Sequence, residues 1–252
     1  MSTTTPAKAS DNPGVRTGKA ILFVHGINGS PDFFWMLEKA VPPGWTLNKV
    51  CLAGHCSTLD DFANASMRKW KEQVRATVIM MRARYRTFVI VGHSMGTLFA
   101  IRHAVEGNAD GIFLINPPLS LHMTKRMFTT PFKIYLDYIP EDDMRTKAAV
   151  NAYSAKVEHN PMKYIRCAPR FIELFIEIIS MRRITRKLTI PARAYMSEND
   201  EMVAKSGCRF FAGQQNTRVT VLPNSSHYYY PDPDRGILVH DLLDLLAQVT
   251  RE

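Results

Sequence analysis

The chain has 252 residues, of which 46% are hydrophobic and 22% are charged, and its formal net charge at pH 7 is +9. This composition supplies enough apolar material for a large core and excludes a disordered chain, a collagen-like chain and a small disulfide-stapled domain. The uncharged stretches 87–101 and 111–124 are shorter than the ~20 apolar residues that span a bilayer, so we expect no stable membrane insertion. Lys and Arg are scattered among helical segments, and we therefore expect no nucleic-acid partner.

The first twenty residues are polar and contain no apolar run. They lack the hydrophobic segment of a secretory signal, so we expect residues 1–19 to form a flexible tail and the protein to be cytoplasmic. The four cysteines match neither a disulfide framework nor the paired spacing of a zinc site: they are Cys51, Cys56, Cys167 and Cys208. Buried free thiols are the simpler expectation, with no metal and no cofactor.

Six short apolar runs alternate with helical segments along the chain, and each run is typical of a buried strand. They span residues 20–24, 46–52, 87–91, 111–115, 192–196 and 218–222. Strands that alternate with helices predict a mostly parallel sheet covered by helices on both faces. We therefore expect an α/β fold of about six strands, with its core formed by residues 20–117 and 189–252.

Two segments carry the apolar spacing of amphipathic helices. The first spans residues 67–81, with apolar positions three and four residues apart, and the second spans residues 236–249. Both are predicted to pack on the sheet.

The alternation stops between residues 118 and 188, where helical and loop patterns occur without a convincing strand. Structureless loops of this length are rare in compact domains, so we expect an inserted helical lid. Within it, the segment 171–181 is apolar on nearly every face and must be covered on several sides. We expect Phe175 and Ile179 to line an acyl pocket beside the nucleophile.

The third strand runs directly into Gly92-His93-Ser94-Met95-Gly96, and a helical stretch follows. A tight turn between a strand and a helix, with glycines where side chains would clash, holds a serine exposed at the sheet edge. The helix N-terminus supplies backbone N–H groups for a developing oxyanion. The motif with this context predicts Ser94 as a nucleophile.

A serine nucleophile needs a histidine base, and that base needs a carboxylate to fix its tautomer. On this fold the chain order is serine, acid, histidine, with each partner after a strand. Asp200 and His227 fit both the order and the placement. Glu198 and Glu201 flank the acid and remain alternatives to it, and Asp232 and Asp234 are disfavoured because they follow the histidine. Other histidines are less suited to be the base: His25, His55, His93, His103, His122, His159 and His240.

The first strand is followed by His25-Gly26-Ile27-Asn28-Gly29. A turn of this kind presents a backbone N–H toward Ser94, and the N–H of Met95 would be the second donor of an oxyanion hole.

With these motifs the sequence resembles the α/β-hydrolase superfamily, in the group that holds bacterial carboxylesterases and monoacylglycerol lipases. The matching segments are FVHGINGS, LAGHCST, VGHSMG, SENDEMV and LPNSSH, and only the lid is poorly matched. The second of these departs from the common pattern because Cys56 stands where relatives more often have glycine. The resemblance implies a triad of Ser94, Asp200 and His227, with the N–H groups of Ile27 and Met95 as the oxyanion hole.

The leading hypothesis is a serine esterase that cleaves carboxylic esters with an apolar acyl chain through an acyl-enzyme intermediate. Thioester hydrolysis, acyl transfer and carbon–carbon bond hydrolysis use the same constellation, and a binding protein that kept the fold without turnover is a further alternative. The expected partner is a small-molecule ester, and the expected assembly is a monomer or a homodimer.

Overall fold

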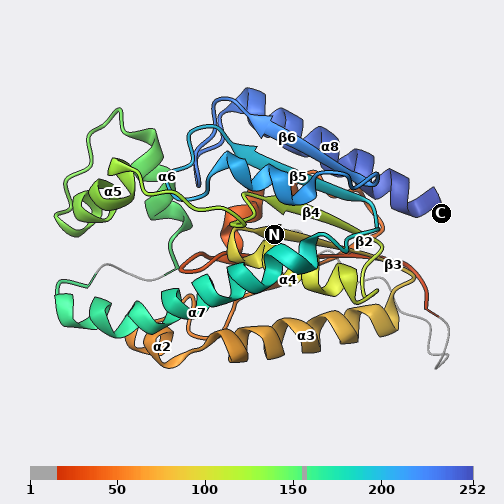
Figure 1. Ribbon diagram of the computed structural model, residues 1–252, viewed down its shortest axis with the longest axis horizontal. Coiled ribbons are helices and arrows are strands. Elements are labelled where there is room, and N and C mark those ends of the chain that lie inside the picture. The colour runs from red at the N-terminus through yellow and green to blue at the C-terminus, as the bar shows by residue number, and fades with distance from the viewer. Residues whose placement is uncertain (1–15, 155–157, 252) are drawn as a thin grey trace.

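The computed structural model describes residues 16–154 and 158–251, so most of the predicted tail 1–19 lies outside the described residues. At its centre is a six-stranded parallel sheet in the order β2-β1-β3-β4-β5-β6 (Figure 1). Its strands are β1 (Lys19–Val24), β2 (Trp45–Val50), β3 (Thr87–His93), β4 (Gly111–Ile115), β5 (Ala192–Ser197) and β6 (Thr217–Leu222). This confirms the predicted α/β fold, and each strand lies within two residues of its predicted bounds.

Helices cover both faces of the sheet. They are η1 (Pro31–Phe34), α1 (Trp35–Glu38), α2 (Leu59–Asn64), α3 (Met67–Arg84), α4 (Met95–Val105), α5 (Lys125–Tyr135), α6 (Met144–Ala152), α7 (Pro161–Thr185), η2 (Lys205–Phe211) and α8 (Asp232–Arg251). The predicted helices 67–81 and 236–249 correspond to α3 and α8. Across the described residues, none of these helices combines the length and hydrophobicity needed to cross a lipid bilayer.

The core has two layers, one on each face of the sheet. Successive side chains of a strand point to opposite faces, and β1 shows the consequence directly. Ala20, Leu22 and Val24 pack in the layer that contains α3, α4 and α7. Ile21 and Phe23 pack in the layer that contains α1 and α8. A strand buried on both faces is continuously apolar, which is why the short runs predicted it well.

The insertion between β4 and β5 consists of α5, α6 and α7, and its parts differ in position. Helix α7 packs along α2 and α4, and its Leu174, Ile178 and Met181 belong to the main core. In Figure 1, α5 and α6 instead stand beyond the carboxyl ends of the strands. The predicted lid 118–188 therefore contains a core helix, and only α5 and α6 overlie the sheet edge where catalytic loops are expected.

The segment that leads into α5 is attached to the loop after β5. Leu121 and Val203 form an antiparallel bridge, and the His122 N–H donates to the Met202 carbonyl at 3.0 Å. The start of this unit is thus held by backbone contacts.

The segment that follows α6 is attached to the loop after β1. Gly29 and Tyr153 form an antiparallel bridge, and the Ser30 N–H donates to the Ala152 carbonyl at 3.1 Å. The α5–α6 unit is consequently held at both ends, each time by a loop that carries predicted site residues.

Candidate active site

Ser94 occupies the junction between β3 and α4. Its backbone has φ 49° and ψ −121°, a strained conformation for a residue with a side chain. A Cβ at Gly96 would overlap the Val24 carbonyl, and a Cβ at Gly26 would lie 2.8 Å from the Ser94 Cβ. These two glycines let the turn fold tightly and let the loop after β1 approach the serine.

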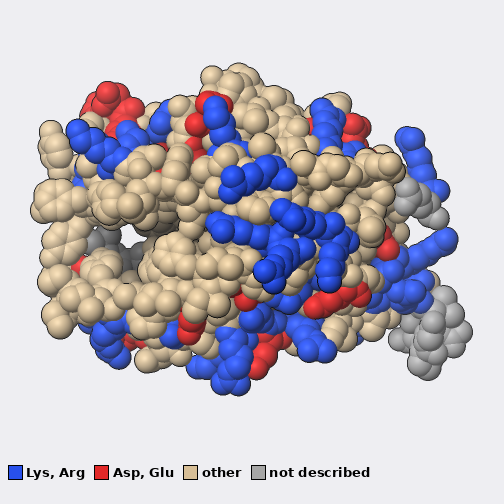
Figure 2. Space-filling view, in the orientation of Figure 1, with Lys and Arg blue, Asp and Glu red and all other residues tan. Residues whose placement is uncertain are grey.

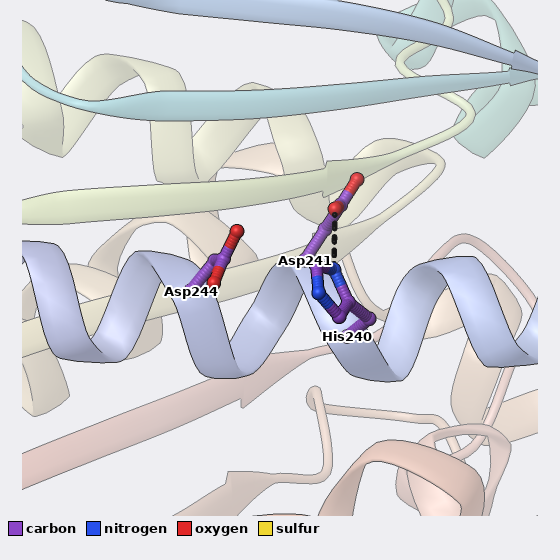
Figure 3. Close-up of side chains that lie close together, drawn as sticks. All are labelled: His240, Asp241 and Asp244. Atoms are coloured by element: carbon purple, nitrogen blue, oxygen red, sulfur yellow. Dashed lines mark hydrogen bonds and ion pairs between the residues drawn. The ribbon is translucent and has the colours of Figure 1, made fainter.

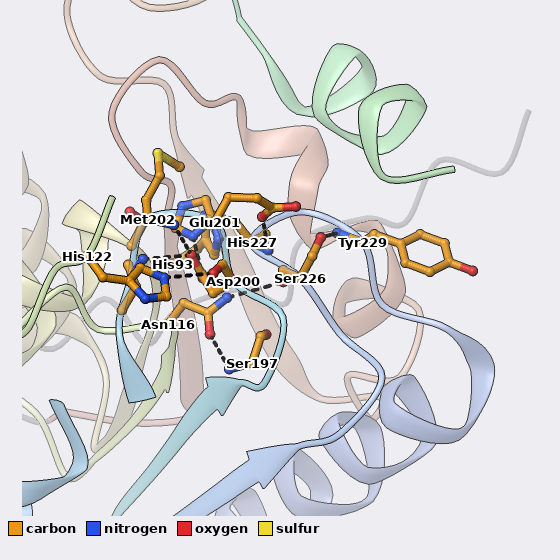
Figure 4. Close-up of polar contacts among 12 residues, drawn as sticks. His93, Asn116, His122, Ser197, Asp200, Glu201, Met202, Ser226, His227 and Tyr229 are labelled. Carbon is orange, nitrogen blue, oxygen red and sulfur yellow. Dashed lines mark hydrogen bonds and ion pairs between the residues drawn. The ribbon is translucent and has the colours of Figure 1, made fainter. Parts of the chain in front are cut away.

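Asp200 and His227 come from neighbouring loops, after β5 and β6, and meet at the carboxyl edge of the sheet (Figure 4). The His227 Nδ1 lies 2.6 Å from the Asp200 Oδ2, and both side chains are buried. The other oxygen, Oδ1, accepts the N–H groups of Met202 and Val203 at 2.8 and 2.7 Å. The carboxylate is thus fixed by its own loop and presents its free oxygen to the imidazole.

The residue before Ser94, His93, contacts the backbone of His227. Burial holds the pKa of His93 well below its usual value, so the ring is neutral, and its Nε2–H donates to the His227 carbonyl at 3.1 Å. The two imidazole rings lie 4.8 Å apart. Among the described residues no hydrogen bond joins the Ser94 hydroxyl to His227. Such contacts are often long before substrate binds.

The predicted oxyanion donors lie on the two segments that flank Ser94. Met95 is the first residue of α4, so its N–H has no partner within the helix. Within the described part of the chain, neither this N–H nor that of Ile27 donates to a protein acceptor. Both donors are therefore free to bind an oxygen of a ligand.

Two neutral histidines hold the turn that carries Ile27. His25 Nε2 accepts the Leu52 N–H at 3.1 Å, so its Nδ1–H donates to the Gly26 carbonyl at 2.8 Å. His55 Nε2 accepts the Asn28 N–H at 3.0 Å. Burial lowers the pKa of His25 to about 4 and that of His55 to about 3, so neither ring carries a charge near neutral pH.

Further residues position His227, and the sequence did not identify them in this role. The Glu201 Oε2 accepts the His227 N–H at 3.1 Å, and the Tyr230 hydroxyl donates to the His227 carbonyl at 3.0 Å. The His122 Nε2–H donates to the Asp200 carbonyl at 2.8 Å. The only signal in the sequence was the placement of these residues beside the predicted acid, base and lid.

A pocket of about 60 Å³ lies beside His227, between the loops that carry Asp200 and His227 and helices α5 and α6. Its apolar wall includes Met127 and Pro131 from α5 and Ala149 from α6. Phe175 and Ile179 do not line it, and their side chains on α7 are 49% and 62% exposed. The apolar wall is thus built from other residues than the sequence-based expectation named.

One group of His and Asp side chains in the described residues is close enough to share a metal ion: His240, Asp241 and Asp244 on α8 (Figure 3). Asp241 already accepts a hydrogen bond from the Tyr195 hydroxyl at 2.8 Å and lies 3.5 Å from Arg218. Its charge is thus compensated within the fold, and the group lies on a helix away from the loops that carry Asp200 and His227.

Comparisons with known proteins bear on the family and the fold. The model of the Alpha/beta hydrolase family matches residues 21–237. A thermostable monoacylglycerol lipase from Bacillus sp. (strain H-257) is 24% identical over 237 residues, which cover 90% of each chain.

Two solved structures of low sequence identity share the fold. One is a metagenome-derived lipolytic enzyme, with a TM-score of 0.69 and 19% identity over 94% of this chain and 96% of that one. The other is a monoacylglycerol lipase from Paleococcus ferrophilus, with a TM-score of 0.64 and 13% identity over 94% of this chain and 97% of that one.

Proposed function

The chain belongs to the alpha/beta hydrolase family, and from this premise we propose that it is a serine hydrolase that cleaves carboxylic esters. The observation that carries the proposal is the buried 2.6 Å contact between His227 and Asp200, on loops next to a strained serine turn. The relatives named above are lipases and other lipolytic enzymes, which supports an ester as the substrate.

In the proposed mechanism the Ser94 hydroxyl attacks the ester carbonyl while His227 takes its proton. Asp200 orients the imidazole and stabilises the imidazolium that forms. The N–H groups of Ile27 and Met95 bind the oxyanion of the tetrahedral intermediate. His227 then gives the proton to the departing alcohol, and water activated by the same histidine hydrolyses the acyl-enzyme.

The proposed substrate has an apolar acyl group, and the apolar wall formed by Met127, Pro131 and Ala149 supports this. In the proposal, α5 and α6 alone act as the lid, because α7 is packed into the core. A substrate then enters between the α5–α6 unit and the catalytic loops.

A fluorophosphonate probe tests the proposal directly, since it labels an activated serine. We expect labelling of the wild type and none of the Ser94→Ala variant. A hydrolysis screen over p-nitrophenyl esters and monoacylglycerols of graded chain length then defines the substrate. A folded wild-type protein that is not labelled and hydrolyses none of these esters would favour a binding protein.

A further inference from the structure

Building on the proposed ester hydrolysis, we propose that the pocket beside His227 binds an anionic group of the substrate and that Arg145 selects it. The substrate class is short esters whose acyl part ends in a carboxylate. This adds a charge requirement to the apolar acyl group proposed above.

Arg145 lies on the face of α6 that borders the pocket. Arg145 and Ala149 line it, at the spacing of four residues that places side chains on one side of a helix. Tyr153, the residue that follows the helix in an extended conformation, lines it as well. Lys147 does not line the pocket, and its Nζ donates to the Glu141 carbonyl at 2.6 Å. The same helix thus carries one cation at the pocket and one away from it.

The charges around the pocket do not cancel. Arg126 lies 2.6 Å from Asp143 and 3.7 Å from Glu201, and Lys133 lies 2.7 Å from Asp143. Within residues 16–154 and 158–251, Arg145 makes no ion pair or hydrogen bond. Of the two cations that line the pocket, Arg126 is therefore paired with Asp143 and Glu201, whereas Arg145 has no counter-ion among the described residues.

The hydrogen-bonding groups of the pocket show the same imbalance. Burial and the charge of Glu201 raise the pKa of Tyr153 to about 12, so its hydroxyl remains a donor, and it has no acceptor among the described residues. Glu201 is the carboxylate in the lining, and it already accepts the His227 N–H and faces Arg126. A ligand that brings acceptor oxygens and a negative charge satisfies both free donors.

The dimensions of the pocket favour a short ligand. The space open to the centre of a water molecule is about 60 Å³. One water needs roughly 10–15 Å³ of such space, so the pocket has room for about four to six waters. The lining also contains apolar side chains, among them Met127, Pro131 and Ala149. A short methylene spacer between the ester and the carboxylate fits this wall.

The test compares two methyl esters of equal acyl length, monomethyl glutarate and methyl pentanoate, by the rate of methanol release. We expect the wild type to prefer the anionic ester in kcat/KM by about tenfold or more. Arg145→Gln should lower the ratio of the two kcat/KM values by about tenfold to a hundredfold. Lys147→Gln removes a positive charge from the same helix and should leave the ratio unchanged.

A wild type without preference for the anionic ester, or an equal loss for both esters in Arg145→Gln, would overturn the assignment. Hydrolysis of neutral esters alone would leave the proposed function standing and reject the anion site. If the wild type hydrolyses no ester, calorimetry of monomethyl glutarate with Ser94→Ala and with Ser94→Ala/Arg145→Gln decides the anion site separately. Binding that requires Arg145 supports it, and equal or absent binding rejects it.

Discussion

His227 is subject to opposing effects on its pKa. Burial lowers it, but the charge and hydrogen bond of Asp200 and the charge of Glu201 outweigh burial, so the pKa lies above the usual 6.5. A general base must be neutral, so activity is lost as the pH falls through this raised pKa. The acidic limb of the pH profile of kcat/KM is therefore expected above pH 6.5.

Asp200→Asn should remove most of the activity, because the carboxylate fixes the tautomer of His227. We expect kcat to fall by about four orders of magnitude and the acidic limb of any residual activity to move to lower pH. Steady-state kinetics over a range of pH measure both effects. Activity near the wild-type level in this variant would contradict the assignment of the acid.

Glu201→Gln should shift the acidic limb of the pH profile in the same direction as Asp200→Asn, but by less. Glutamine keeps an oxygen that can accept the His227 N–H but removes the charge that raises the pKa of the ring. The acidic limb should move to lower pH. Glu198→Gln is the matched control on the same loop, because the Glu198 side chain is 42% exposed and pairs with Lys205. If Glu198→Gln abolished activity instead, the acid would be misassigned.

At the level of single residues, the sequence predicts positions better than contacts. Ser94, Asp200 and His227 followed from a motif and a chain order, and their catalytic roles stay predictions until tested. The bond from His93 to the His227 carbonyl spans 134 residues, and no local pattern encodes such a contact. His93 was considered as a base, whereas its buried, neutral ring supports the backbone of the predicted base.

Among the elements, α7 is joined to α3 and α4 by a buried carboxylate. Glu177 is 2.9 Å from Lys71 and 2.6 Å from Arg102, and its side chain is 7% exposed. Burial raises its pKa, but the hydrogen bonds and charges of Arg102 and Lys71 outweigh burial and hold the pKa below the usual 4.5.

Glu177→Ala should destabilise the fold by about 1–3 kcal/mol, because it leaves two cations without their partner. Urea unfolding measures the difference. A depressed pKa contributes stability that is present above pH 4.5 and is lost as the pH falls below it, so the gap between wild type and variant should shrink in acid. A gap that stays constant below pH 4 would contradict this role of the carboxylate.

Ala149→Leu should narrow the pocket beside His227 and penalise longer acyl chains. The kcat/KM for butyrate esters divided by that for acetate esters should fall, because the added side chain occupies part of a volume of about 60 Å³. Phe175→Ala is the comparison variant, since Phe175 lies on the exposed face of α7. A change of the ratio in Phe175→Ala alone would contradict this role of the pocket and support the expectation that Phe175 lines the acyl pocket.

The sequence predicted the existence of α7 but not its surroundings. Its apolar residues occur on many faces, and this pattern is equally typical of a helix buried on several sides and of one with an apolar exposed face. Leu174 and Ile178 are buried, whereas Ile172 and Ile176 are more than half exposed. Only the packing of α2 and α4 decides which face is covered.

For the molecule as a whole, the sheet was predictable because each strand carries its own apolar run and each loop with a predicted catalytic residue follows a strand. The positions of the inserted helices were not predictable, since they depend on contacts with segments far away in the sequence. Figure 2 shows Lys and Arg side chains gathered over the middle of one face, where α4 and the C-terminal part of α7 lie in Figure 1. With a net charge of +9, the protein attracts anions.

The positive electrostatic potential that follows from this net charge predicts a salt effect for charged substrates. Raising the ionic strength should lower kcat/KM for monomethyl glutarate, because screening weakens the attraction of the ester to the protein and to Arg145. The value for methyl pentanoate should change little, and it serves as the control in the same salt series. An identical response of the two esters would contradict a role for charge in substrate capture.

The attachment of the α5–α6 unit at both ends has a consequence for exchange of amide hydrogens with deuterated water. At one end of the unit the His122 N–H donates to the Met202 carbonyl, and at the other end the Ser30 N–H of the loop after β1 donates to the Ala152 carbonyl. If the unit opens as one body, both amides should report the same free energy of opening. Under conditions in which every opening leads to exchange, the two amides also share one exchange rate, which is the opening rate. That opening rate is the upper limit for turnover of any substrate that enters only through the open state.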